Sequence, residues 1–128
     1  MNSGVYVFIA LGGALGALGR YILSNIIHSR TGPGFPAGTF IVNILGCFLL
    51  GLVFILSTEK LTISANMRTF LSIGFLGAFT TFSTFSLETL SLIKGGEIKT
   101  ALFNVLGSLI IGLLAVWLGT IVAQIITR

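Results

Sequence analysis

The chain has 128 residues, of which 55% are hydrophobic and 8% are charged, and its mean hydropathy is +1.10. A soluble domain carries about 25% charged residues, so the composition excludes an ordinary soluble domain and indicates one integral membrane domain over residues 1–128. The net charge of +4 sits mainly near segment ends and forms no basic cluster. It therefore favours anchoring at lipid headgroups and argues against nucleic-acid binding.

Four apolar windows are long enough to cross a membrane as helices, since about 20 residues span the hydrocarbon core. Turn-forming residues separate the first two windows, a polar stretch separates the second and third, and a tight segment separates the last two. The N-terminus lacks a basic region before its apolar stretch, so we expect no cleavable signal. The expected spans are residues 4–27, 38–56, 69–93 and 98–126.

Positive residues are balanced between the two sides of this four-span arrangement. The three on one side are Lys60, Arg68 and Arg128, and the three on the other are Arg30, Lys94 and Lys99. An excess of Lys and Arg normally fixes the cytoplasmic side. The tie favours insertion in both orientations and an antiparallel homodimer of opposite copies. A single orientation fixed by other features is the alternative.

The first two spans carry small and polar residues at helical spacing. Gly12 and Gly16 form a small-xxx-small pattern, which is typical of close helix contacts in membranes. Thr39 and Asn43 are spaced i,i+4 and share one face of the second span. The Asn43 amide has two interpretations: an interhelical hydrogen bond that holds the bundle, or a donor on a polar path.

The third span contains the most unusual stretch, GFLGAFTTFSTFS at residues 74–86. It combines two glycines, five hydroxyl residues and four phenylalanines, whereas a lipid-facing helix is rich in Leu, Ile and Val. Phe82 and Phe85 share a face at i,i+3, and we expect Phe75 and Phe79 to continue roughly the same side. Irregular backbone at membrane depth is tolerated only against protein or water. The stretch therefore predicts a binding track or conduit, with core packing as the alternative.

The fourth span repeats small or polar residues every fourth position. This stripe is either a helix-packing seam or one wall of a polar track, and it consists of Thr100, Asn104, Ser108 and Gly112. No carboxylate lies near the centre of any span, because Glu88 comes late in the third. That argues against a buried proton carrier. No set of residues indicates catalysis, so we do not expect an enzyme.

Three motifs together resemble the Fluc (CrcB-type) fluoride channels over essentially the whole chain. They are GALGR followed by Tyr21, GTFIVNILG at residues 38–46, and GFLGAFTTFSTFSLE at residues 74–88. The resemblance implies a passive fluoride-selective channel in the cell (inner) membrane that lowers cytoplasmic fluoride. It also implies an antiparallel homodimer of four-helix subunits with two pores, in which the third helix is broken around residues 77–80.

The resemblance further implies particular sites. A central structural sodium ion (Na⁺) would be held by the backbone carbonyls of Gly77 and Thr80 from both subunits. The fluoride pore would comprise Asn43, Phe82, Ser83, Thr84, Phe85 and Ser108. Arg20 matches a characteristic arginine whose role stays open. Asn104 stands where many relatives carry tyrosine, so the outer track is expected to differ here.

Three alternatives to a passive channel follow from the same residues. A fluoride/proton antiporter would need a pH gradient for flux. A small dual-topology multidrug-type exporter would need a carboxylate in the first span, and that span has none. A subunit that transports nothing would use its polar stripes only for helix packing.

Overall fold

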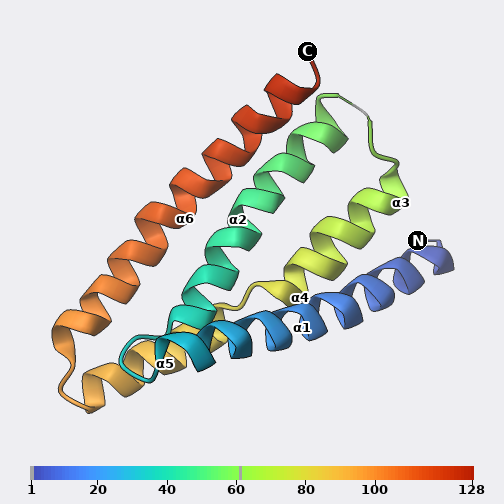
Figure 1. The fold of residues 1–128 in the computed structure, drawn as a ribbon. Helices are drawn as coiled ribbons and strands as arrows, with labels where there is room; N and C mark the ends of the chain where they lie inside the picture. Colours follow the sequence, from blue (N-terminus) through green and yellow to red (C-terminus); the bar gives the residue numbers. More distant parts are fainter. Residues whose placement is uncertain (1, 61) are drawn as a thin grey trace.

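The computed structural model describes residues 2–60 and 62–128, and within them every regular element is a helix. Four stretches of helix in this part of the chain are long and apolar enough to cross a membrane. The expected all-α fold with four spanning segments is therefore confirmed. The four stretches are Ser3–Thr31, Ala37–Thr58, Ala65–Lys94 and Ile98–Ile126 (Figure 1).

Three of the stretches are single helices, and the third is a series of shorter elements. The single helices are α1 (Ser3–Thr31), α2 (Ala37–Thr58) and α6 (Ile98–Ile126). The series consists of α3 (Ala65–Arg68), the π-helix η1 (Thr69–Leu76), α4 (Gly77–Phe79) and α5 (Phe82–Lys94). Helix α1 ends at Gly32, whose φ of 77° lies in the left-handed region that favours glycine.

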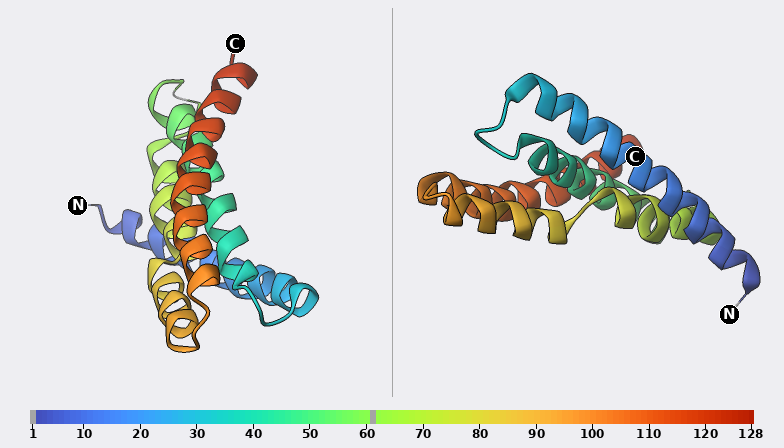
Figure 2. Two further views of the ribbon diagram at one scale, coloured as in Figure 1. Left: turned by 90° about the vertical axis from the view of Figure 1, so that its left-hand side faces the viewer. Right: turned by 90° about the horizontal axis from the view of Figure 1, so that it is seen from below.

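The third span is broken between α4 and α5, as expected, but the break lies slightly later than the range 77–80. Gly77 is still helical, whereas Thr80 (φ −85°, ψ 153°) and Thr81 (φ −149°, ψ 113°) are extended. The extended connection is visible between the yellow and orange coils in the right-hand view of Figure 2. Threonine is β-branched and adopts this conformation readily, so the two threonines carry the break.

Glycines set the close contact between α1 and η1. A Cβ atom added at Gly12 would overlap the backbone carbonyl of Phe70, and one at Gly16 would overlap that of Phe75. The small-xxx-small contact expected for these two glycines is confirmed, and its partner is the third span. Such close backbone approach gives van der Waals packing in a medium that supplies no hydrophobic drive between helices.

A second glycine pair joins α2 to α6, which run side by side in Figure 1. A Cβ atom at Gly51 would overlap the Val116 carbonyl, and one at Gly119 would overlap the Phe48 carbonyl. Each helix therefore contributes one glycine to the contact with the other. The bundle consists of two tightly packed pairs, α1 with the first half of the third span and α2 with α6.

The four phenylalanines of the third span do not share one face, which corrects the expectation from helical spacing. Phe75 and Phe79 stack with ring centroids 5.6 Å apart and belong to the core, where Phe79 is only 4% exposed. Phe82, by contrast, is 80% exposed in the single chain. The extended residues 80–81 interrupt the helical rotation, so the phase of α4 is not carried into α5.

The glycine contacts make a testable prediction about stability. Gly16→Ala should lower the thermal unfolding midpoint in detergent, because overpacking against backbone costs about 1–3 kcal/mol. Gly4→Ala is the matched control, since a Cβ atom there meets nothing within 4 Å. Equal unfolding midpoints for the two variants would contradict the close α1–η1 contact.

Candidate functional site

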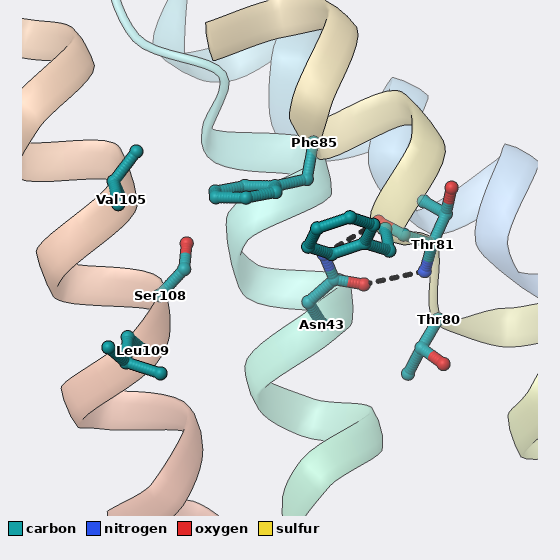
Figure 3. A pocket seen from close by; sticks show the side chains of 8 residues that line it. Asn43, Thr80, Thr81, Phe85, Val105, Ser108 and Leu109 are labelled. Atoms are coloured by element: carbon teal, nitrogen blue, oxygen red, sulfur yellow. Dashed lines mark hydrogen bonds between the residues drawn. The ribbon is translucent and has the colours of Figure 1, made fainter.

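The break in the third span is held by one side chain of α2. The Asn43 Oδ1 accepts a hydrogen bond of 2.8 Å from the Thr81 backbone N–H, and the Asn43 Nδ2 donates one of 3.1 Å to the Thr81 carbonyl (Figure 3). A single amide thus satisfies both backbone groups of the extended residue. Of the two interpretations of Asn43, the interhelical hydrogen bond is therefore present, and it serves the break.

Thr81 in turn begins α5. Its hydroxyl oxygen accepts the Thr84 backbone N–H at 3.1 Å and lies 3.0 Å from the Thr84 hydroxyl, to which it donates. The Ser83 hydroxyl lies 3.3 Å from the same oxygen. This is an N-cap, in which an extended residue replaces the missing helical acceptor with its side chain. Sequence reasoning missed the role of Thr81, although a threonine ahead of a helical run is a capping signal.

A pocket of about 500 Å³ opens beside the break. It is enclosed by α2, the extended segment, α5 and α6, and it contains four of the side chains predicted for the pore (Figure 3). Its lining residues are Asn43, Thr80, Thr81, Phe82, Phe85, Val105, Ser108 and Leu109. The structure therefore brings Asn43, Phe82, Phe85 and Ser108 together, whereas Ser83 and Thr84 are not among the lining residues.

The walls of this pocket are aromatic on one side and carry a hydroxyl on the other. The Phe82 and Phe85 rings have centroids 5.7 Å apart and are tilted by 40°. The Phe85 ring extends from α5 toward α6, which carries Ser108 (Figure 3). The Ser108 Oγ is buried and has no hydrogen-bond partner in the part of the chain that the structure describes. A buried hydroxyl without a partner is costly, so this group is suited to a ligand.

Thr84 borders a second, smaller cavity of about 260 Å³ on the other side of the break. Unlike the first pocket, it contains ionisable side chains, and Thr81 lines both. Thr39 donates a hydrogen bond of 2.8 Å to the Glu88 carboxylate here, which joins α2 to α5. Its lining residues are Arg20, Ser24, Asn25, His28, Gly38, Thr39, Thr81, Thr84 and Glu88.

Arg20 reaches from α1 to the end of α4. Its Nε donates a hydrogen bond of 3.0 Å to the Ala78 carbonyl, in the last turn before the break. The C-terminal end of a helix carries partial negative charge, and a guanidinium there is stabilising. Arg20 therefore satisfies a carbonyl that the break leaves without a helical donor.

The capping contacts release two carbonyls at the break. In an unbroken α-helix, the Gly77 carbonyl would accept from the Thr81 N–H, and the Thr80 carbonyl would accept from the Thr84 N–H. Asn43 takes the first of these donors and the Thr81 hydroxyl takes the second. Within residues 2–60 and 62–128, neither carbonyl has a hydrogen bond. Carbonyl oxygens of an unwound helix are suited to Na⁺, so these two groups fit the ion expected from the sequence.

Residues 7–120, most of the chain, match the model described as CrcB-like protein, Camphor Resistance (CrcB). The chain belongs to the CrcB-like family. The resemblance inferred from its motifs is thereby confirmed.

Curated relatives of this CrcB-like chain agree closely with it along their length. A protein of Magnetococcus marinus is 48% identical over 119 residues, which cover 93% of this chain and 97% of the relative. A protein of Hydrogenovibrio crunogenus is 51% identical over 113 residues, which cover 88% of this chain and 86% of the relative. A protein of Solibacter usitatus is 47% identical over 119 residues, which cover 93% of this chain and 98% of the relative. All three carry the name fluoride-specific ion channel FluC.

The Asn43 contact predicts a large effect of one substitution. Asn43→Leu removes the partners of both the Thr81 N–H and its carbonyl, and each buried group left unpaired costs about 1–3 kcal/mol. The unfolding midpoint of the variant in detergent should therefore fall well below that of the parent chain. Asn66→Leu, at an exposed position of α3, is the control. A midpoint for Asn43→Leu that matches this control would show that the break does not depend on the amide.

Proposed function

We propose that this CrcB-like protein is a passive fluoride-selective channel that exports fluoride and lowers its cytoplasmic concentration. The observation that carries the proposal is the pocket beside the break, where two phenylalanine rings face a hydroxyl without a partner. The names of the relatives support fluoride as the ion. The four spanning helices support a multi-pass location, for which we propose the cell (inner) membrane.

Neutral hydrogen-bond donors at the pocket fit a small anion. Fluoride is strongly hydrated, so a selective path must replace its water with well-placed donors. Ser108 offers its hydroxyl, and Asn43 has a second N–H, since only one of its two is used on Thr81. An aromatic ring is positive at its edge, so Phe82 and Phe85 add weak contacts to an anion.

The uncharged lining of the pocket favours passage over tight binding. None of its eight lining residues is ionisable at neutral pH. A fixed cation would hold the anion, whereas weak contacts in series let it enter and leave. A membrane potential of about 100 mV, negative inside, supplies roughly 2.3 kcal/mol per charge for anion exit. No further energy source is needed.

We place the aqueous approach to the pocket at the smaller cavity. Arg20 lies in that cavity with Thr84, and Thr81 lines both this cavity and the phenylalanine pocket. Arg20 attracts anions here without lining the narrow path, and it offsets the charge of the Glu88 carboxylate, which lies in the same cavity and accepts a hydrogen bond from Thr39. Ser83 and Thr84, which lie beside the Thr81 hydroxyl, would then donate to the ion as it passes the break.

We further propose an antiparallel homodimer with a central Na⁺ and two pores. The carbonyls of Gly77 and Thr80 are suited to a cation because no hydrogen bond to them is made within the described residues, but one copy supplies only two such oxygens. A second copy in the opposite orientation would bring its own Gly77 and Thr80 to the same ion. Gly77 and Phe82 are exposed in the single chain, which supports a partner at this surface.

Fluoride efflux tests this function directly. Vesicles loaded with potassium fluoride and containing the protein should release fluoride after valinomycin is added, while vesicles loaded with potassium chloride retain their anion. Efflux that requires an imposed pH gradient would favour a fluoride/proton antiporter. Vesicles that hold fluoride as tightly as protein-free ones would leave only the subunit that transports nothing, or an exporter of other compounds.

Ring substitutions test the conduction path. Phe82→Ile and Phe85→Ile should each slow fluoride efflux at least about ten-fold, because an aliphatic side chain offers no positive edge to the anion. Phe54→Ile, at an exposed phenylalanine of α2 outside the pocket, should keep the parent rate. Normal efflux in both pocket variants would refute conduction along the ring edges.

The sodium site predicts a selective salt effect on stability. Na⁺ should raise the unfolding midpoint relative to N-methylglucamine at equal ionic strength, because an ion at 100 times its dissociation constant adds about 2.7 kcal/mol to the free energy of unfolding. Thr80→Ala should keep this rise, because the carbonyl remains when the side chain is removed. Equal midpoints in the two salts would contradict the sodium site, and a rise lost in Thr80→Ala would assign it to the hydroxyl.

A further inference from the structure

Asn104 is one of the most buried side chains of the described chain. It is 1% exposed on α6, and it does not line the phenylalanine pocket. Its Nδ2 donates a hydrogen bond of 3.0 Å to the Thr89 hydroxyl oxygen on α5. This is the one hydrogen bond between α5 and α6 in the part of the chain that the structure describes.

Thr89 is also hydrogen-bonded to the backbone of Phe85. Its hydroxyl donates a hydrogen bond of 2.8 Å to the Phe85 carbonyl, one turn back on α5. The hydroxyl has a single proton, so its oxygen is left to accept from Asn104. The three groups form a directed chain from amide to hydroxyl to carbonyl, in which each bond polarises the next. A threonine that bonds back to its own helix also bends that helix.

The contact lies one turn from the pocket on both helices. On α5, Thr89 is four residues after Phe85, whose ring lines the pocket. On α6, Asn104 is four residues before Ser108, which lines the facing wall. Residues four apart on a helix share a face. The Asn104–Thr89 bond therefore joins α5 to α6 one turn away from Phe85 and Ser108.

We infer that Asn104 is a positioning residue for ion passage, which acts through Thr89 to hold the Phe85 ring against the Ser108 wall. This inference rests on the proposed function for its effect on fluoride. Asn104 does not touch the ion. It sets the width of the pocket, whereas Phe85 and Ser108 supply the contacts.

Efflux from vesicles tests the inference with matched variants. Asn104→Leu keeps the branched shape of the side chain and removes its donor, and Thr89→Val removes the hydroxyl. Each should slow fluoride efflux about three- to ten-fold, as expected for the loss of one hydrogen bond. The double variant should be no slower than the slower single variant, since both changes break one chain of bonds. Efflux losses that multiply in the double variant would overturn the inference.

Thr120→Val is the control for the hydroxyl change. Thr120 also donates to a carbonyl of its own helix, that of Trp117 at 2.6 Å, but on α6 away from the pocket. Its variant should keep the parent efflux rate. A similar slowing in Thr120→Val would show a general effect of such threonines and would overturn the inference.

A spectroscopic readout separates this inference from the proposed function. 4-Fluorophenylalanine placed at position 85 reports the surroundings of the ring by ¹⁹F nuclear magnetic resonance, whichever ion passes. Asn104→Leu and Thr89→Val should both shift or split the resonance, whereas Thr120→Val should not. An unchanged resonance in both pocket-side variants would overturn the inference, and Thr89→Val alone decides if Asn104→Leu does not fold. Vesicles that contain the unsubstituted protein and still retain fluoride would instead overturn the proposed function.

Discussion

A helix that breaks inside a membrane must find partners for the backbone groups it frees, because lipid offers none. Here one amide meets that demand. Asn43 binds both backbone groups of Thr81, and the Thr81 hydroxyl then caps the next helix by accepting the Thr84 N–H. Without these contacts the extended residues would be unstable at this depth. The pocket, the released carbonyls and the split of the phenylalanines all follow from this junction.

The two halves of the third span, before and after the break, make different contacts. Before it, η1 and α4 pack against the glycines of α1, and Phe79 lies in the core. After it, α5 presents Phe82 and Phe85 to the pocket. A continuous helix of the same sequence would place all the rings in one phase. The change of phase lets neighbouring phenylalanines serve packing in one half and the pocket in the other.

Much of this arrangement could be predicted from the sequence, because hydropathy and small-residue spacing act over whole spans. The four spans and the contact of Gly12 and Gly16 are confirmed. Side-chain partners across helices were beyond such patterns. The spacing of Asn104 and Ser108 suggested one stripe, yet the first bonds to Thr89 and the second lines the pocket. Helical spacing places two residues on one face, but it does not show which residue of the facing helix each one meets.

The most direct test of this account is an experimental structure of the protein in a bilayer mimetic containing fluoride and Na⁺. The account predicts extended backbone at residues 80–81 with the Asn43 amide bonded to Thr81. It also predicts ion- or water-sized density beside the Ser108 hydroxyl and the edge of the Phe85 ring. A third span that is helical through these residues, with the Asn43 side chain turned away, would contradict it.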